Sequence, residues 1–121
     1  MKAILFFGII FFTIISCKSQ VENGTISSVN KISEVNFLNE NNVLLDVRTP
    51  EEFQKGNIPN SINLDYNSSE FDSLIKNLDP NKTYYVYCKS GNRSTKAVVK
   101  MKEFGFKNTI NLKDGYSAYK E

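Results

Sequence analysis

The sequence predicts a single α/β domain, built on a parallel sheet with helices on both faces, behind a separate N-terminal segment. From Asn30 onward, apolar or β-branched runs of strand length alternate with segments of helical spacing, which is typical of parallel strands joined by helices. A glycine-containing loop joins the clearest strand, residues 83–87, to a helix, and ligands gather at this end of parallel strands. The 121 residues, 40% of them hydrophobic, suffice for one such domain.

The first sixteen residues predict a signal peptide, because Lys2 precedes an apolar run from Ala3 to Ile15. As a helix this run would span roughly 20 Å, too short for a hydrocarbon core of ~30 Å. The segment Ile14-Ile15-Ser16-Cys17 resembles the bacterial lipobox. That resemblance implies cleavage before Cys17 and attachment of lipid to its sulfur. The alternatives are an uncleaved N-terminal anchor and a plain secretory signal without lipid.

The predicted organisation has three parts: a lipoprotein signal peptide at 1–16, a lipidated cysteine and tether at 17–27, and the folded domain at 28–121. The polar residues 18–27 extend at most ~35 Å and would hold the domain close to a bilayer. Two or three acyl chains on one cysteine make a durable anchor. We therefore expect a lipid-anchored protein of the bacterial cell envelope, on the periplasmic or membrane-surface side, in either the inner or the outer membrane.

The domain is expected to open with a helix and a buried strand. Ile32, Val35 and Leu38 recur at helical spacing, which predicts a short amphipathic helix with Asn30 as its N-cap. Residues 43–47 form a compact apolar run, as expected of a strand that is buried on both faces.

The next predicted elements are two helices with a short strand between them. Pro50 and the two acidic residues after it favour the start of a helix. Residues 62–64 predict a second strand. Ser69 with Asp72 three residues later approximates a capping box, which predicts a helix from Ser69 onward.

The C-terminal half contains the clearest signals. Residues 83–87 are rich in β-branched and aromatic side chains and predict a strand. A helical apolar stripe begins at Ser94 and is closed by Gly105. Residues 109–112 predict the last strand, and residues 116–119 a terminal helical turn.

Cys88 follows the clearest strand directly and is the candidate nucleophile. A helix that begins at Ser94 directs free N–H groups and the positive end of its dipole toward the loop. Gly91 permits the positive φ of a curled, anion-binding loop, while Lys89 and Arg93 add positive charge. These features predict a pKa below the ~8.5 of a free thiol, and hence a thiolate near neutral pH. The alternative is a buried structural cysteine. The candidate anion-binding loop comprises Lys89, Ser90, Gly91, Asn92, Arg93 and Ser94.

The composition excludes several classes of function. The chain has no histidine, which removes Ser-His-Asp and Cys-His catalysis and nearly every zinc, copper or non-haem iron site. Two cysteines cannot supply a four-thiolate metal cage. We therefore expect neither a metal nor a cofactor. A net charge of +2, without a block of like charges, argues against nucleic acid as a partner.

Three segments together resemble the single-domain rhodaneses, a family of thiosulfate sulfurtransferase-like proteins. Residues 44–53, LLDVRTPEEF, are similar to the family signature LLDVRxPxEF. Residues 56–64, GNIPNSINL, are similar to GHIPGAxNL, and residues 86–94, VYCKSGNRS, to the catalytic strand and loop. The resemblance implies a five-stranded parallel sheet flanked by helices and a catalytic Cys88 that alternates between thiolate and persulfide.

The same resemblance implies two partners in sulfur transfer. One is a small sulfur donor, either thiosulfate or a persulfide, and the other is an acceptor, which could be cyanide, a thiol or a protein cysteine. Three positions depart from the family pattern and leave the substrate preference open. Asn57 stands where histidine is usual, Asn60 where glycine is usual, and Tyr119 near a common tryptophan.

Asp46 and Arg48 lie at the end of the neighbouring strand and are expected to support the loop. Arg48 could pair with Glu51 or Glu52, and Asp46 could accept hydrogen bonds from loop N–H groups. A direct role of these two residues in the mechanism is the alternative.

Three other functions are alternatives to sulfur transfer. Phosphatases of the related type use Cys-x₅-Arg, but here Ser94 occupies the arginine position and Arg93 lies one residue too early for phosphate. A disulfide oxidoreductase would need a resolving cysteine, and Cys17 is expected to carry lipid. A non-catalytic persulfide carrier or rhodanese-like binding module remains as the alternative.

Overall fold

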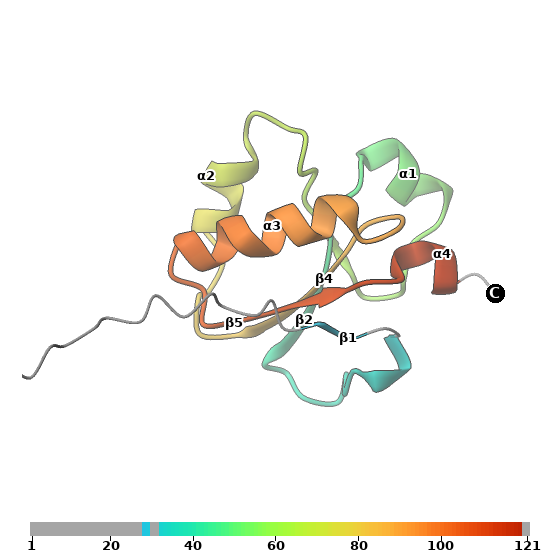
Figure 1. Ribbon diagram of the computed structural model, residues 1–121, viewed down its shortest axis with the longest axis horizontal. Helices are drawn as coiled ribbons and strands as arrows, with labels where there is room; N and C mark the ends of the chain where they lie inside the picture. The colour runs from blue at the N-terminus through green and yellow to red at the C-terminus, as the bar shows by residue number, and fades with distance from the viewer. Residues whose placement is uncertain (1–27, 30–31, 120–121) are drawn as a thin grey trace, which may run out of the picture.

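The computed structural model describes residues 28–29 and 32–119 (Figure 1). The predicted signal peptide at 1–16 and the predicted tether at 17–27, with Cys17, lie outside the described residues. Among the helices of the described ranges, none has the length and apolar character needed to cross a membrane.

Five strands form one parallel sheet in the spatial order β1-β5-β4-β2-β3. They are β1 (Ser28–Val29), β2 (Asn42–Asp46), β3 (Ile62–Asn63), β4 (Thr83–Tyr87) and β5 (Asn108–Leu112). The edge strands β1 and β3 have two residues each, so β2, β4 and β5 carry most of the backbone pairing. Val86 of β4 lies between Leu45 of β2 and Asn111 of β5. The predicted α/β class, a parallel sheet flanked by helices, is confirmed.

The helices are η1 (Ile32–Glu34, a 3₁₀ turn), α1 (Pro50–Lys55), α2 (Phe71–Lys76), α3 (Asn92–Glu103) and α4 (Gly115–Tyr119). Figure 1 shows α2 and α3 on one side of the sheet, with α1 and α4 near the end where β4 and β5 finish. The short helices α1 and α4 therefore lie where ligands of parallel sheets bind.

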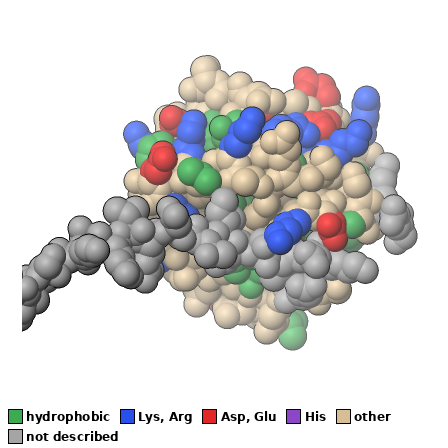
Figure 2. Space-filling view, in the orientation of Figure 1, with side chains coloured by type: hydrophobic (Ala, Val, Ile, Leu, Met, Phe, Trp, Pro, Cys, Tyr) green, Lys and Arg blue, Asp and Glu red, His purple; other side chains and the backbone are tan. Residues whose placement is uncertain are grey.

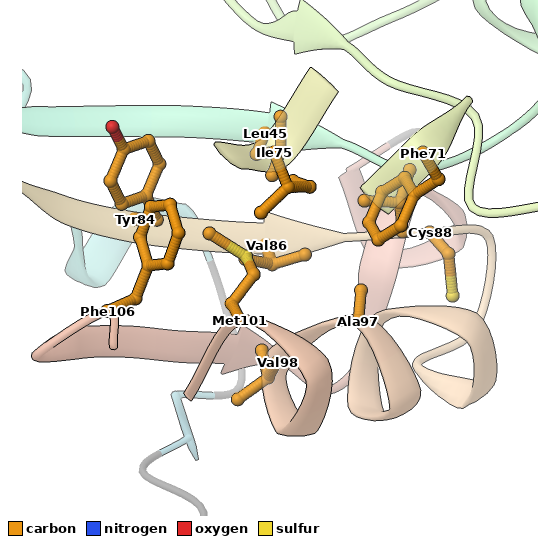
Figure 3. Packing of buried hydrophobic residues seen from close by; sticks show 11 residues of the cluster. Leu45, Phe71, Ile75, Tyr84, Val86, Cys88, Ala97, Val98, Met101 and Phe106 are labelled. Carbon is orange, nitrogen blue, oxygen red and sulfur yellow. The ribbon is translucent and has the colours of Figure 1, made fainter. Parts of the chain in front are cut away.

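The core has two layers because the side chains of β4 alternate between the faces of the sheet. Val86 and Tyr84 face α2 and α3, and Figure 3 shows them packed with Met101 and Phe106. Tyr87 points to the other face. The second layer contains Val35, Leu44, Ile58, Tyr87 and Leu112, with Ile32, Tyr85 and Tyr116 packed against it.

The solvent side of α3 is basic. Lys96, Lys100 and Lys102 lie on this helix, whose buried residues are Ser94, Ala97, Val98 and Met101. Figure 2 shows basic side chains in a band across this part of the surface. Acidic side chains are interspersed, and Lys100 pairs with Asp72 of α2 at 2.8 Å.

The prediction of a helix that includes Ile32, Val35 and Leu38 is wrong beyond the first turn. Only η1 forms, and the side chain of Leu38 is 96% exposed. The side-chain oxygen of Asn36 accepts a hydrogen bond from the N–H of Leu38 at 3.0 Å, which replaces the helical pairing with a local turn. The predicted N-cap Asn30 lies outside the described residues.

The capping box predicted at Ser69 and Asp72 is also wrong, because α2 begins at Phe71 and its N-cap, Glu70, makes no side-chain cap hydrogen bond. Instead, the hydroxyl of Ser68 accepts from the N–H of Glu70 at 3.1 Å.

Candidate active site

Cys88 lies immediately after β4, beneath the loop that leads into α3 (Figure 3). Its side chain is 1% exposed. The sulfur accepts a hydrogen bond from the N–H of Gly91 at 3.1 Å, and the hydroxyl of Ser94 lies 3.5 Å away. The predicted nucleophile is therefore held by the loop that the sequence singled out.

The helix after this loop begins at Asn92, two residues earlier than predicted. Gly91 is its N-cap and has a φ of 92°, a left-handed conformation that favours glycine. Asn92 has no positive φ, so the left-handed geometry of the loop rests on Gly91 alone. The earlier start places Ser94 in the first helical turn, where its hydroxyl faces the sulfur of Cys88.

The environment of Cys88 has opposing effects on its pKa. Burial disfavours the thiolate and raises the pKa. Hydrogen bonds from the hydroxyl of Ser94 and from the backbone N–H groups of Ser94, Ser90 and Gly91 favour it more strongly. The net pKa lies below the ordinary value of the thiol, as the sequence predicts.

Helix α4 fixes the outward-facing carbonyls of the loop. The N–H of Tyr116 donates to the carbonyl of Cys88 at 2.9 Å, and the N–H of Ser117 donates to that of Lys89 at 3.1 Å. The carbonyl of Lys89 and the N–H of Ser90 point in opposite directions from the same peptide unit, so turning this carbonyl toward α4 directs the N–H of Ser90 toward the sulfur. The sequence alone did not predict this role of α4.

Gly115 makes this approach of α4 possible. It has a φ of 59°, and a Cβ at this position would meet the carbonyl oxygens of Cys88 and Lys89 at 2.6 Å. We predict that Gly115→Ala displaces the loop and slows sulfur uptake by Cys88 about 100-fold, the effect of a ~1 Å misplacement. The rate of mass gain of the protein in thiosulfate measures this.

Gly105→Ala is the matched control for Gly115→Ala. Gly105 also has a positive φ, 91°, but a Cβ there meets nothing within 4 Å. This variant should lose about 1 kcal/mol of unfolding free energy from backbone strain and keep its sulfur uptake. Equal uptake rates in the two variants would contradict the role given to α4.

Asp46 and Arg48 form a buried ion pair, with side chains 0% and 3% exposed. The guanidinium binds both carboxylate oxygens of Asp46, at 2.7 to 3.1 Å, and donates to the carbonyl of Gly56 at 2.7 Å. The predicted pairing of Arg48 with Glu51 or Glu52 is therefore wrong, because Asp46 lies two residues away on the same turn. Asp46 does accept a loop N–H, that of Arg48 itself, at 2.9 Å. The supporting role remains a prediction.

Arg93 pairs with Glu52 across the site through two hydrogen bonds of 2.7 and 2.9 Å. Glu52 also completes a capping box with Thr49 at the start of α1. The hydrogen bonds from Arg93, followed by those from Thr49, lower the pKa of Glu52 to about 2 in spite of partial burial. The charge of Arg93 is thus neutralised by Glu52. The sequence predicts that Arg93 adds positive charge to the loop, and it does not predict this partner.

Glu52→Gln tests this pair through the pH dependence of stability. A carboxylate whose folded-state pKa is about 2 stabilises the fold above its ordinary value of 4.5, and this stabilisation is lost as pH falls from 4.5 toward 2. Because both side chains are partly exposed, we expect only ~1 kcal/mol. Urea unfolding across this window should show a flatter pH dependence for Glu52→Gln. Glu51→Gln, the neighbouring exposed carboxylate, should retain the wild-type slope.

A cleft of about 250 Å³ opens between α1 and α4, beside the loop. Its lining includes Arg48, Lys55, Lys89 and Tyr116. Cys88 is not a lining residue, so the cleft lies next to the buried sulfur and not over it. Lys55 and Lys89 are exposed and take part in none of the ion pairs of the described residues. They are the unmatched cations of the site.

The structure thus places Ser90, Gly91 and Ser94 around the sulfur of Cys88. Lys89 lies on the rim of the cleft. Asn92 is exposed, and Arg93 turns to Glu52. Sequence reasoning missed Lys55, which ends α1, the helix that begins within the LLDVRTPEEF segment. Within the described residues, no group of histidine, cysteine, aspartate and glutamate side chains could hold a metal ion.

Two of the three departures from the family pattern have structural explanations. Asn60 adopts a φ of 66°, and asparagine is the residue that replaces glycine most readily in this conformation. The side chain of Asn57 donates to the carbonyl of Phe53 at 3.0 Å and closes the end of α1. Tyr119 is 41% exposed and lies 6.0 Å from the ring of Tyr116.

Comparison with known proteins places the chain in a family. Residues 34–121 match the model of the Rhodanese-like domain. The chain belongs to the rhodanese-like family. Among solved structures of similar fold, SSP1007 from Staphylococcus saprophyticus is 28% identical, with a TM-score of 0.67 over 78% of this chain and 93% of that one.

Curated relatives of this rhodanese-like domain have names that refer to sulfur. Thiosulfate sulfurtransferase 16 from the chloroplast of Arabidopsis thaliana is 35% identical over 85 residues, covering 62% of this chain and 71% of the relative. The putative sulfur carrier protein YrkF of Bacillus subtilis is 38% identical over 72 residues, which cover 60% of this chain and 38% of the relative. Adenylyltransferase and sulfurtransferase UBA4 of Debaryomyces hansenii is 34% identical over 95 residues, which cover 69% of this chain and 21% of the relative. The chain therefore spans well under half of the last two relatives. These names support sulfur transfer as the general chemistry.

Proposed function

We propose that this protein is a sulfurtransferase that moves sulfane sulfur from a donor such as thiosulfate to a thiophilic acceptor through a persulfide of Cys88. The observation that carries the proposal is the set of hydrogen-bond donors around the sulfur of Cys88, which favour its thiolate. This sulfur receives the N–H of Gly91 and lies beside the hydroxyl of Ser94, in a rhodanese-like domain whose relatives are named sulfurtransferases or a sulfur carrier.

The proposed reaction has two balanced steps. In the first, the Cys88 thiolate attacks the outer sulfur of thiosulfate, and the S–S bond of the donor breaks. Sulfite leaves with the bonding electron pair, and Cys88 carries a persulfide. In the second, the acceptor attacks the terminal sulfur, and the Cys88 thiolate leaves. With cyanide as acceptor the product is thiocyanate, and no oxidant or proton donor is required.

The charges of the site suit an anionic donor and an anionic intermediate. Backbone N–H groups and the Ser94 hydroxyl that stabilise the thiolate would also stabilise the negative charge of a persulfide. Lys89 belongs to the loop and is not matched by an ion pair among the described residues, so we assign it to attraction of the donor. We assign Arg93 to holding the site in place, because its ion pair with Glu52 connects the start of α3 to α1.

The direct test separates the two steps. The protein is incubated with thiosulfate, and its mass and the released sulfite are measured; a gain of one sulfur atom with an equal amount of sulfite is expected. Cyanide is then added, and thiocyanate should appear as the mass returns to its starting value. Absence of any mass gain with thiosulfate, and with a persulfide as an alternative donor, would refute the proposal.

A non-catalytic carrier is the second candidate, and the burial of Cys88 favours it. A sulfur that is 1% exposed is poorly placed for rapid exchange with free donors, and one relative is named as a putative sulfur carrier. A carrier would accept and deliver one sulfur without turnover of thiosulfate and cyanide. Multiple turnovers would exclude it.

We further propose that Cys17 carries lipid and anchors the domain to the bacterial cell envelope, on the periplasmic or membrane-surface side. The lipobox-like segment before Cys17 supports this. Cys17→Ala should release the protein from the membrane fraction or block its maturation, and should abolish labelling by a fatty-acid analogue. Cys88→Ser is the control and should retain the label. Labelling of the Cys17→Ala protein would contradict the anchor.

A further inference from the structure

A second pocket lies at the end of the sheet opposite Cys88. Its volume is about 290 Å³, and its lining comprises Thr83, Lys102, Lys107, Asn108, Thr109 and Ile110. These residues lie at or next to the starts of β4 and β5 and the end of α3, whereas Cys88 follows the end of β4 (Figure 1). The 5 residues of β4 span roughly 17 Å, at about 3.3 Å per residue. The pocket is therefore separate from the site of Cys88.

The charge of this pocket favours an anion. Lys102 is half-buried and Lys107 is exposed, and neither takes part in an ion pair among the described residues. No acidic side chain from the described part of the chain lines the pocket. Asn108 adds a side-chain amide that can donate hydrogen bonds. Lysine ammonium groups bind phosphate as point charges, while the planar fork of arginine is the better match for a carboxylate.

Thr109 adds a buried donor without a partner. Its side chain is 2% exposed, and its hydroxyl oxygen makes no hydrogen bond to the described residues. Buried hydroxyl groups are nearly always hydrogen-bonded, so this one requires an explanation. A bound anion that accepts from the hydroxyl provides it. The alternative is a water molecule that bridges Thr109 to Oδ1 of Asn111, which also has no partner and lies on the same face of β5.

We propose that this pocket binds the phosphate monoester of a small molecule, a ligand distinct from the sulfur donor and acceptor. Lys102 and Lys107 match the nearly two negative charges of a monoester near neutral pH, and the hydroxyl of Thr109 donates to one of its oxygens. The volume corresponds to roughly ten water molecules at ~30 Å³ each, more than the phosphate alone requires. Ile110 offers an apolar contact to the organic part. The proposal does not depend on the sulfurtransferase function.

The test follows thermal unfolding of the full chain in a neutral detergent, with glycerol phosphate added at constant ionic strength. Binding to the native state raises the Tm, and its concentration dependence gives the dissociation constant. Lys102→Gln and Lys107→Gln should each raise this constant about fivefold, the upper range for one exposed charge. Thr109→Val should raise it about tenfold, because a hydrogen bond to a charged group is lost. Lys96→Gln, exposed on α3 outside the pocket, should match the wild type.

Thr109→Val also has an expected effect without the ligand. Valine replaces an unpartnered hydroxyl by an apolar group of the same shape, so the variant should be at least as stable as the wild type when no monoester is present. The order of stability should then reverse when glycerol phosphate is added. A less stable variant with an unchanged dissociation constant would assign the hydroxyl to a bridging water and overturn the proposal.

Two further comparisons define the place and the nature of the ligand. Cys88→Ser should bind glycerol phosphate as the wild type does, because Cys88 does not line the pocket. Weaker binding by Lys89→Gln with normal binding by Lys102→Gln would place the anion at the loop of Cys88 and overturn the proposal. An equal or larger rise in Tm with a short-chain phosphatidylglycerol, a singly charged diester, would assign the pocket to a lipid headgroup and also overturn it. Absence of any rise in Tm would overturn this proposal alone.

Discussion

Replacement of Cys88 by serine is expected to reduce sulfur transfer to the uncatalysed background. The hydroxyl has a far higher pKa than the thiol and would remain un-ionised in the same loop, so it could neither attack the donor nor hold a transferable sulfur. Mass spectrometry after incubation with thiosulfate should show no added sulfur, and a thiocyanate assay should show no turnover. Residual loading of Cys88→Ser would assign the nucleophile elsewhere.

The ionisation of Cys88 gives this prediction a second readout. Because the pKa of the thiol is lowered, its alkylation by iodoacetamide should reach half of its maximal rate below the ~8.5 of a free thiol. Ser94→Ala removes the hydroxyl that lies 3.5 Å from the sulfur and should move this midpoint upward. Cys88→Ser should fold as the wild type does, which a thermal unfolding curve checks.

Asp46→Ala is expected to cause the largest loss of stability. The carboxylate is fully buried and is the only ion-pair partner of Arg48 among the described residues, so its removal leaves a buried charge without compensation. Loss of one partner from such a pair destabilises a fold by roughly 3–5 kcal/mol. Urea unfolding at neutral pH should measure this as a lower midpoint with an unchanged slope.

Two comparisons identify the cause of that loss. Asp72→Ala breaks an exposed pair with Lys100, whose side chains are 49% and 33% exposed, and should have a much smaller effect. Asp46→Ala combined with Arg48→Met removes both charges and should recover part of the lost stability. If the double variant were no more stable than Asp46→Ala, the unpaired charge would not be the reason for the loss.

Local patterns were sufficient for the elements with strong side-chain signals. The strand predicted at 83–87 coincides with β4, because its β-branched and aromatic residues fit a half-buried pleated surface. Strand β2 differs by one residue from the prediction at 43–47. The start of α3 was misplaced because its N-cap, Gly91, has no side chain to signal it. The capping box of Thr49 and Glu52 follows a recognisable four-residue pattern and was overlooked.

The parts of the site that could not be predicted depend on contacts distant in sequence. Arg93 and Glu52 are 41 residues apart, and only the arrangement of α1 against α3 brings them together. The hydrogen bonds from α4 to the loop join Tyr116 to Cys88 in the same way. Spacing predicts which residue types lie at the end of the sheet, but not which charges neutralise one another there.

The dependence of the loop on α4 also has a consequence during synthesis of the protein. Helix α4 follows all five strands in the chain, so the nucleophile and its loop emerge from the ribosome before the segment that orders their carbonyls. A nascent chain that still lacks α4 would contain the loop without the N–H donors that Tyr116 and Ser117 supply to the carbonyls of Cys88 and Lys89. The final backbone arrangement of the loop would therefore form late, after the rest of the domain has been made.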